Sequence, residues 1–319
     1  MISQQIALVF PGQGCQSVGM GLELYECSAA AREVFDQANA VLGFDLAELC
    51  FRGPAETLDD TANTQPAIYA ASMALWRVLE PRLAPYRSRV AYLAGHSLGE
   101  FTALTAAGAL DFEAGLRLVR RRGEAMRAAG AAAPGGMAAI IGLEDGDVAD
   151  IVAEATAGED RAWIANYNAP GQVVIAGNGG ALDRAMALAK TRGARRALPL
   201  AVSVACHTPL MAAAAAELGI ALAETEFRAP WAPVVSNVSA EPLADPAAIR
   251  EALLRQLSGP VRWVESVQAM AAAGVSRMVE IGPKAVVSGL IKRIAPEVNL
   301  LAVSDAAGIE AFNGEEWGA

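Results

Sequence analysis

The feature that most constrains this chain is a serine bracketed by glycines, GHSLGE at residues 95–100, which lies between two apolar runs. The run before it, residues 90–94, has the composition of a buried strand, and the run after it, residues 101–107, favours a helix. So sharp a strand-to-helix turn needs glycine on both sides of the serine, because a Cβ there would collide with the returning backbone. The pattern predicts an α/β protein with Ser97 as a nucleophile at a helix N-terminus; the alternative is a glycine turn without chemistry.

A serine hydroxyl attacks weakly unless a base accepts its proton, and that base is usually a histidine. The chain has two histidines. His96 is next to Ser97 on the turn, where side chains of successive residues diverge, so it is badly placed for this role. His207 follows the apolar run 197–204; a single histidine at a strand end is more often structural, but here it is the remaining candidate. We therefore predict that His207 is the base for Ser97.

A second glycine-rich turn, PGQGCQ at residues 11–16, follows the short apolar strand predicted at residues 6–10. Such a turn leaves backbone N–H groups free to face an anion. It has neither the spacing of a dinucleotide-binding loop nor that of a P-loop, which argues against a nucleotide. An oxyanion hole suits it better, because that hole combines the N–H after the nucleophile, here Leu98, with one from another loop. We predict Gln13 as the second donor.

The hydrophobic pattern places Arg122 on the buried side of its helix, unlike its neighbouring arginines. At about 100° per residue, Arg122 projects between Leu118 and Val119 in the apolar stripe of the helix that follows Asp111. A buried arginine needs an anionic partner, because an unpaired buried charge costs several kcal/mol. Two partners remain open at this point. One is a carboxylate of the protein, and the other is a substrate carboxylate, which a guanidinium binds through both oxygens.

The composition fits a soluble enzyme with one large core and no metal. The chain has 319 residues, of which 54% are hydrophobic and only 6% aromatic, as in alanine- and leucine-rich α/β proteins. Its four cysteines show no CxxC or other metal spacing, and two histidines are few for a zinc site. We therefore expect no metal, no bound cofactor and reduced thiols, as in a cytoplasmic protein.

Neither the ends of the chain nor its charge indicate a membrane or a nucleic acid. The first five residues do not lead from basic residues into an apolar signal segment, and no apolar run of about 18 residues follows. The net charge of −10 disfavours nonspecific binding of nucleic acid, although local basic residues could receive an acidic partner. Two such groups are Lys190, Arg192, Arg195 and Arg196, and Lys284, Lys292 and Arg293.

The pattern of predicted elements changes between the serine and the histidine. The predicted order there is βαββαβ, with strands at 137–143, 163–167, 172–176 and 196–202 and helices at 147–157 and 180–191. This is the ferredoxin-like arrangement. We predict a discontinuous hydrolase-like core at 1–131 and 203–319, with a parallel sheet, and an inserted ferredoxin-like subdomain at 132–202 that forms one wall of a cleft. The core resumes with strands at 233–238, 277–281 and 300–303 and helices at 245–256, 264–273 and 284–294.

Together these motifs resemble the malonyl-CoA:acyl-carrier-protein transacylases, the family of the acyltransferase domains of fatty-acid and polyketide synthases. The resemblance is carried by FPGQGCQ at 10–16, GHSLGE at 95–100, Arg122-Gly123 and NYNAPGQ at 166–172. It continues with HTPLM at 207–211, RQL at 255–257 and EIGP at 280–283, so that it covers roughly residues 5 to 295.

The resemblance assigns a role to each candidate residue. It implies that Ser97 carries the acyl group, that His207 is the base and that Arg122 holds the malonyl carboxylate. It also implies that Gln13 and Leu98 supply the oxyanion N–H groups. The histidine of the family is oriented by a backbone carbonyl at the position of Gln256, whereas spacing alone leaves open a conventional acidic third member. Asn166 and Cys206 are assigned to substrate binding.

Two positions depart from the pattern of the family. Cys15 stands where serine is common and is nearly isosteric with it. Cys206 stands before the histidine, where phenylalanine or serine often shapes the acyl pocket, so the choice between malonyl and a branched malonyl unit is left open.

The implied activity is ping-pong transfer of malonyl from malonyl-CoA to an acyl carrier protein, for fatty-acid or polyketide synthesis. Two alternatives stay open. One is a serine esterase or acyl hydrolase that acts on CoA-bound or carrier-bound acyl chains, and the other is a noncatalytic scaffold that binds a carrier protein. A hydrolase for neutral acyl chains gains nothing from a buried arginine, and intact catalytic residues argue against a scaffold.

Overall fold

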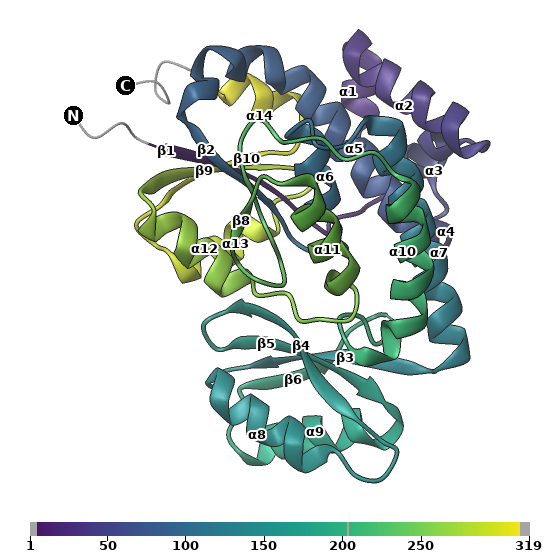
Figure 1. Ribbon diagram of the computed structural model, residues 1–319, viewed down its shortest axis with the longest axis vertical. Coiled ribbons are helices and arrows are strands. Elements are labelled where there is room, and N and C mark those ends of the chain that lie inside the picture. The colour runs from purple at the N-terminus through teal and green to yellow at the C-terminus, as the bar shows by residue number, and fades with distance from the viewer. Residues whose placement is uncertain (1–4, 203, 313–319) are drawn as a thin grey trace.

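The computed structural model describes residues 5–202 and 204–312, which form a large α/β core and a smaller sheet below it (Figure 1). The large sheet has six strands. Their order is β10 (Asn299–Val303), β9 (Val275–Ile281), β1 (Gln5–Phe10), β2 (Val90–Gly95), β7 (Val234–Val235) and β8 (Pro242–Leu243). All neighbours pair in parallel except β7 and β8, which are antiparallel. The predicted α/β class with a parallel sheet is confirmed.

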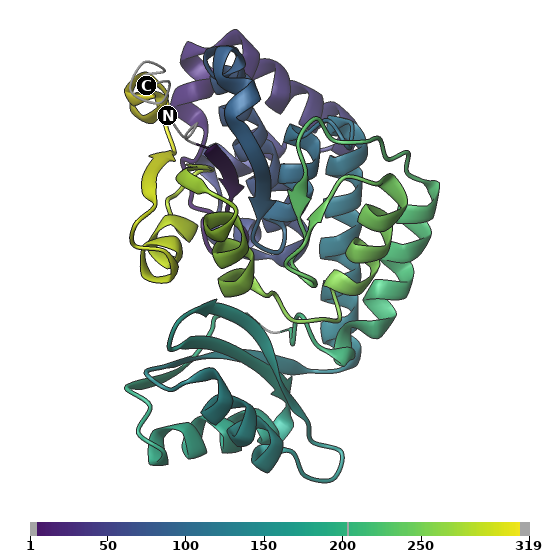
Figure 2. The same cartoon turned by 60° about the vertical axis from the view of Figure 1, so that its left-hand side comes forward.

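Helices cover both faces of this sheet, which explains why its central strands are apolar on both sides (Figure 2). In β1, Leu8 packs into the larger hydrophobic cluster and Val9 into the smaller one. The larger cluster is formed mainly with α2 (Ala29–Leu42), α5 (Thr61–Leu83), α6 (Gly99–Ala106), α7 (Phe112–Ala132) and α10 (Ala212–Glu224). The smaller cluster is formed with α12 (Trp263–Ala272) and α13 (Val287–Ile294).

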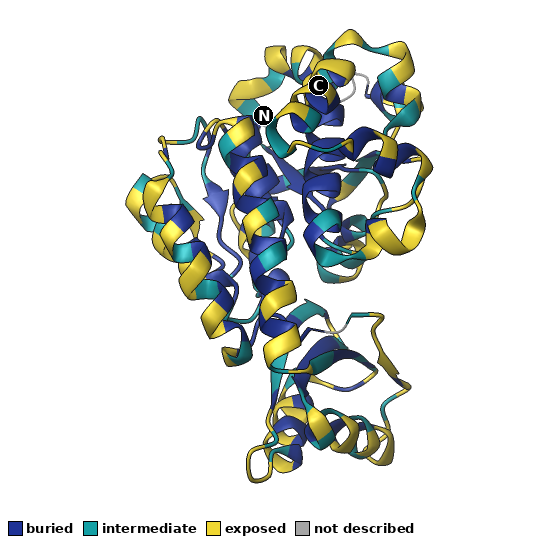
Figure 3. Cartoon of the chain, turned by 90° about the vertical axis from the view of Figure 1, so that its right-hand side faces the viewer, coloured by how far each residue is buried: buried dark blue, intermediate teal, exposed yellow. Residues whose placement is uncertain are grey.

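The remaining helices of the core are short or lie at its edge, where their outer faces are exposed (Figure 3). They are α1 (Leu22–Cys27), α3 (Leu46–Arg52), α4 (Ala55–Asp59), α11 (Pro246–Gln256), α14 (Ala306–Ala311) and the 3₁₀ turns Ala84–Arg89 and Pro209–Met211. Within the described residues, no helix has the length and apolar character needed to cross a membrane.

The second sheet follows the predicted βαββαβ order. It consists of β3 (Gly135–Ile141), α8 (Asp145–Ala155), β4 (Ala162–Ala169), β5 (Gln172–Asn178), α9 (Gly179–Thr191) and β6 (Arg196–Pro199). The strands lie in the order β4-β5-β3-β6, all neighbours are antiparallel, and α8 and α9 pack on one face. The predicted ferredoxin-like module is therefore confirmed as part of the fold.

The second sheet is joined to the core along the edge strand β4. Tyr167 donates its backbone N–H to Val261 O at 2.9 Å, and Val261 N–H donates to Ala165 O at 2.8 Å. Arg293 of α13 donates to Pro170 O at 2.6 Å and also hydrogen-bonds the Gln172 side chain. These contacts hold the β4 edge against the core, whereas β6 forms the opposite edge.

Several predicted boundaries differ from the structure by one or two residues, and three were wrong for a local reason. The strand predicted to reach residue 202 ends at Pro199, which has no N–H to donate to a ladder. The strand predicted at 233–238 has only two paired residues, because the chain turns at Ser236, whose N–H bonds to Glu241 O at 2.9 Å. The helix predicted from residue 284 begins at Val287, where the buried Glu280 carboxylate accepts three backbone N–H groups of the first turn.

Candidate active site

Ser97 lies on a sharp turn between β2, which ends at Gly95, and α6, which begins at Gly99. Its φ of 53° is left-handed, an uncommon conformation for a residue with a side chain. A Cβ at Gly95 would lie 1.9 Å from the Gly99 carbonyl carbon, and one at Gly99 would lie 2.3 Å from Phe10 O. The turn is therefore the predicted nucleophile elbow, and both glycines are required by backbone contacts.

Two side chains from distant segments hold the backbone of Ser97. Asn237 Oδ1 accepts the Ser97 N–H at 2.6 Å, and Asn237 Nδ2 donates to Gly95 O at 2.7 Å. On the other side, Gln256 Nε2 donates to Ser97 O at 2.8 Å. Asn237 was not predicted, because no local sequence pattern identifies a residue 140 positions away from the serine.

His207 is brought to the serine as predicted. Its Nε2 lies 2.8 Å from Ser97 Oγ, and its Nδ1 lies 2.8 Å from the backbone carbonyl of Gln256. A carbonyl only accepts, so Nδ1 carries the proton and Nε2 is free to take one from the serine. Burial, followed by the charge of Arg122, lowers the pKa of His207 to about 3, which keeps the imidazole neutral at pH 7. The partner of Nδ1 is a carbonyl and not an acidic side chain.

Arg122 is 1% exposed and directs its guanidinium at the same serine. One amino group donates to Ser97 Oγ and to Gln256 Oε1, both at 3.0 Å, and the other donates to Gln65 Oε1 at 2.7 Å. Burial lowers the pKa of Arg122 to about 10, so it remains charged at neutral pH. No carboxylate forms an ion pair with Arg122 in the described part of the chain, which leaves an anionic ligand as its natural partner.

The two predicted oxyanion donors lie on turns beside the serine. Leu98 precedes α6, and Gln13 follows β1, which is paired with β2. Among the described residues, no acceptor takes the backbone N–H of either residue. Gln13 also lines a cavity of about 450 Å³ between the start of α5, the end of α7 and the residues Ala201, Val202 and Val204. Both N–H groups are thus available to an anion.

The other two predicted substrate-binding residues are buried. Cys206 lies next to His207, and burial raises its pKa to about 11, opposed mainly by the charge of Arg122. Asn166 is in β4, where its backbone bridges to Val261, and its side chain makes no hydrogen bond with another described residue. Their roles in substrate binding stay predictions.

The His96 side chain contacts residues outside the catalytic group. Its Nε2 lies 2.8 Å from Asn168 Oδ1 in β4, and its ring packs edge-on against Trp263 with centroids 5.5 Å apart. Burial lowers the pKa of His96, so it is a neutral side chain that connects the elbow to the second sheet.

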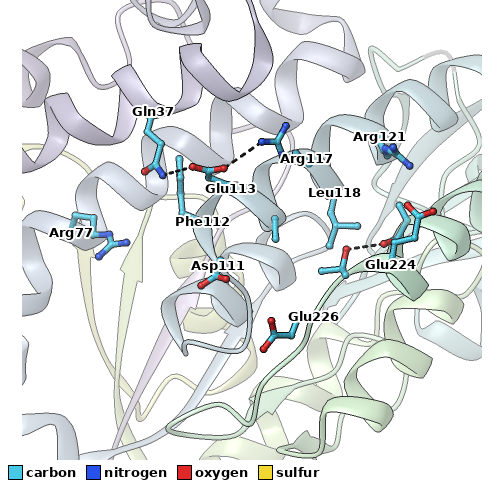
Figure 4. Close-up of a pocket in the computed structure, with 13 residues that line it drawn as sticks. Gln37, Arg77, Asp111, Phe112, Glu113, Arg117, Leu118, Arg121, Glu224 and Glu226 are labelled. Carbon is cyan, nitrogen blue, oxygen red and sulfur yellow. Dashed lines mark hydrogen bonds and ion pairs between the residues drawn. The ribbon is translucent and has the colours of Figure 1, made fainter.

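A separate cavity lies on the outer side of α7 (Figure 4). It measures about 700 Å³, and its lining includes the ion pair between Glu113 and Arg117. Glu113 binds both Gln37 and Arg117, and Arg228 binds Asp111. The chemistry of the serine site is therefore separate from this groove.

The comparisons with known proteins cover nearly the whole chain. The acyl transferase domain family matches residues 7–308. The malonyl CoA-acyl carrier protein transacylase of Salmonella typhimurium is 47% identical over 307 residues, which are 96% of this chain and 98% of that protein. The enzyme of the same name from Escherichia coli K12 is 46% identical over 309 residues, with 96% and 98% covered.

Solved structures agree with these sequence relatives. A crystal structure of an acyl carrier protein S-malonyltransferase from Vibrio cholerae superposes with a TM-score of 0.91 at 47% identity, and covers 97% of this chain and 100% of its own. A type II PKS acyl-carrier protein in complex with its malonyl-transacylase contains a chain with a TM-score of 0.91 at 43% identity, with 97% and 98% covered.

Proposed function

This chain belongs to the acyl transferase family of malonyl-CoA:acyl-carrier-protein transacylases, and we propose that it carries malonyl from malonyl-CoA to an acyl carrier protein through an ester on Ser97. The observation that carries the proposal is the position of Arg122. Its guanidinium is 3.0 Å from Ser97 Oγ, is buried, and has no carboxylate partner among the described residues. A malonyl group would place its free carboxylate there.

In the first half of the reaction, the Ser97 hydroxyl attacks the thioester carbonyl of malonyl-CoA. His207 Nε2 takes the serine proton as the new C–O bond forms, and the oxyanion accepts hydrogen bonds from the backbone N–H groups of Leu98 and Gln13. The C–S bond then breaks, and the proton on His207 passes to the departing thiolate of coenzyme A. A malonyl ester of Ser97 remains.

In the second half, the phosphopantetheine thiol of an acyl carrier protein takes the place of coenzyme A. His207 removes the thiol proton, the thiolate attacks the ester, and Ser97 recovers its hydroxyl as the C–O bond breaks. The residues present supply every proton and charge that these steps need, so we assign no metal and no bound cofactor. Within the described residues no cluster of metal-binding side chains is found.

A serine hydrolase would use the same nucleophile and base but would deliver the acyl group to water. Arg122 favours an acid-terminated acyl group over a neutral chain, because a neutral chain would leave the guanidinium buried without a counter-charge. We also infer that the carrier protein and malonyl-CoA are the partners, that no nucleic acid or membrane takes part, and that the enzyme works in the cytoplasm.

Mass spectrometry of the intact protein tests this function directly. Incubation with malonyl-CoA should add one malonyl group to the wild-type chain and none to Ser97→Ala, because the elbow holds no second nucleophile. His207→Ala should slow the loading by several orders of magnitude, since only the oxyanion hole and binding remain. A malonyl adduct that persists on the Ser97→Ala protein would contradict the assignment.

A further inference from the structure

Glu100 is a buried carboxylate that the transfer steps above do not use. It lies in the first turn of α6, three residues after the nucleophile, and is 3% exposed. No arginine or lysine in the described part of the chain forms an ion pair with it. Instead, its Oε2 accepts from Gln256 Nε2 at 2.7 Å and its Oε1 accepts from the Asn237 N–H at 3.4 Å. Burying a carboxylate is costly, so its place behind the serine calls for an explanation.

The carboxamide of Gln256 lies between Glu100 and Arg122 and is oriented by both. Its Nε2 donates to Glu100 Oε2 and to Ser97 O, and its Oε1 accepts from Arg122 at 3.0 Å. An amide has donors on one side and an acceptor on the other. With two acceptors on the Glu100 side, the oxygen of Gln256 is left facing the guanidinium. If the amide were reversed, its NH₂ group would face the positive charge.

The same two residues that contact Glu100 also hold the catalytic groups. The Gln256 backbone carbonyl orients His207, and the Asn237 side chain holds the left-handed Ser97. Burial raises the pKa of Glu100 to about 7, although hydrogen bonds from Gln256 and Asn237 and the charge of Arg122 oppose the rise. Glu100 and Arg122 thus do not touch each other, but both hydrogen-bond the carboxamide of Gln256 that lies between them.

We propose that Glu100 is a positioning residue for malonyl loading, whose carboxylate fixes the Gln256 carboxamide and thereby holds the Arg122 guanidinium beside Ser97. The inference rests on the proposed function. The orientation of His207 does not depend on Glu100 in this way. Its Nδ1 binds the backbone carbonyl of Gln256 and makes no contact with the side-chain amide that Glu100 holds. Glu100 therefore acts on recognition of the malonyl carboxylate more than on the nucleophile.

The variant Glu100→Gln tests this with almost no change in shape. The native carboxylate accepts at both oxygens, whereas a glutamine can accept at only one, so its NH₂ group must face either Gln256 or Asn237. We expect kcat/KM for malonyl loading to fall by up to about 100-fold, as for a binding group displaced by about 1 Å. Reaction with phenylmethylsulfonyl fluoride, which needs Ser97 and His207 but carries no carboxylate, should change much less.

A double-mutant cycle with Gln256→Ala tests whether Glu100 acts through the Gln256 carboxamide. That change removes the bridging amide but keeps the carbonyl that orients His207. If Glu100 acts through the amide, Glu100→Gln should have little further effect on malonyl loading in the Gln256→Ala background. Equal losses in both backgrounds would overturn the proposal, and so would an unchanged malonyl kcat/KM or equal losses with malonyl-CoA and the sulfonyl fluoride.

Glu280→Gln is the matched control, because Glu280 is another buried carboxylate that accepts backbone N–H groups. This substitution should lower the melting temperature without changing the rate of malonyl loading relative to the rate of reaction with the sulfonyl fluoride. Malonyl loading of the wild-type protein distinguishes a failure of the proposed function from a failure of the role proposed for Glu100. If wild type forms no malonyl ester, the proposed function fails; if it does and Glu100→Gln loads normally, only the role of Glu100 fails.

Discussion

At the scale of single residues, the electrostatics of the site follow from burying Arg122 beside a histidine. The positive guanidinium and the loss of water both oppose protonation of His207, so the imidazole is held as a base. The same guanidinium donates to Ser97 Oγ, where it would favour the alkoxide as the proton leaves. In the proposed mechanism, one arginine would therefore act on the base, on the nucleophile and on the acyl carboxylate.

Arg122→Ala should convert the preference for malonyl into a preference for neutral acyl groups. In wild type, an acetyl group leaves the guanidinium buried without a counter-charge, and the mutation removes that penalty together with the malonyl contact. We expect the ratio of kcat/KM for malonyl-CoA over acetyl-CoA to fall by about 100-fold or more, which is about 2.8 kcal/mol.

Arg121→Ala is the control for this measurement. Arg121 is adjacent in sequence, is exposed, and lines the groove on the outer side of α7. It should keep the wild-type ratio. An unchanged ratio in Arg122→Ala would instead mean that this arginine serves only to support the fold.

At the scale of elements, the strand β2, the turn and the helix α6 work as one unit. Gly99 packs against the backbone of β1, with its missing Cβ directed at Phe10 O and Pro11 O. This contact brings the Gln13 turn next to the Leu98 N–H, because Gln13 lies just after the end of β1. The close packing of two backbones thus sets the spacing of the oxyanion donors.

Gly99→Ala should therefore damage both stability and catalysis. The new Cβ would lie 2.3 Å from Phe10 O and 2.8 Å from Pro11 O, and backbone atoms cannot rotate away as a side chain can. We expect a loss of about 1–3 kcal/mol in the free energy of unfolding by urea, together with slower malonyl loading. Gly146→Ala in α8, where no atom lies within 4 Å of the added Cβ, should instead stabilise the protein by about 0.5–1 kcal/mol. Equal stability of the Gly99→Ala and wild-type proteins would show that β1 can move aside.

The sequence predicted the elements whose signal is local. Glycine spacing revealed the Ser97 turn, and helical periodicity revealed that Arg122 is buried, because both patterns lie within a few residues. The network behind the serine was not predictable in this way. This network consists of contacts between segments that only the tertiary fold brings together, made by Asn237, Gln65 and Glu100. In the sequence, Glu100 has the pattern of an ordinary residue in the first turn of a helix.

At the scale of the whole molecule, charge limits how an acidic partner can approach. The chain carries a net charge of −10, so an acidic carrier protein is repelled at long range and must dock on local basic residues. Of the residues predicted for this role, Arg293 is engaged with Pro170 and Gln172, and Arg192 pairs with Glu154. Three exposed residues of the first group have no side-chain partner among those described: Lys190, Arg195 and Arg196.

Reversing these charges should weaken transfer to the carrier protein but not loading. In Arg195→Glu/Arg196→Glu we expect a higher KM for carrier protein and an unchanged rate of Ser97 malonylation. Added salt should slow wild-type transfer more than transfer by the variant, because the contact is screened over a Debye length of about 8–10 Å. Lys284→Glu/Lys292→Glu tests the second group in the same assay. If neither variant changes the KM or its salt dependence, the carrier protein docks elsewhere.

The order of strands in the large sheet also determines when the enzyme can be completed during synthesis. The second sheet ends at Pro199, so the ribosome has released every strand of it before Val261, which anchors its β4 edge, is made. By contrast, β1 precedes the other described strands and pairs with β9, which ends at Ile281. The strand β1 therefore stays without this neighbour until residues 275–281 have been made, and it exposes an apolar edge that a nascent-chain chaperone would have reason to cover.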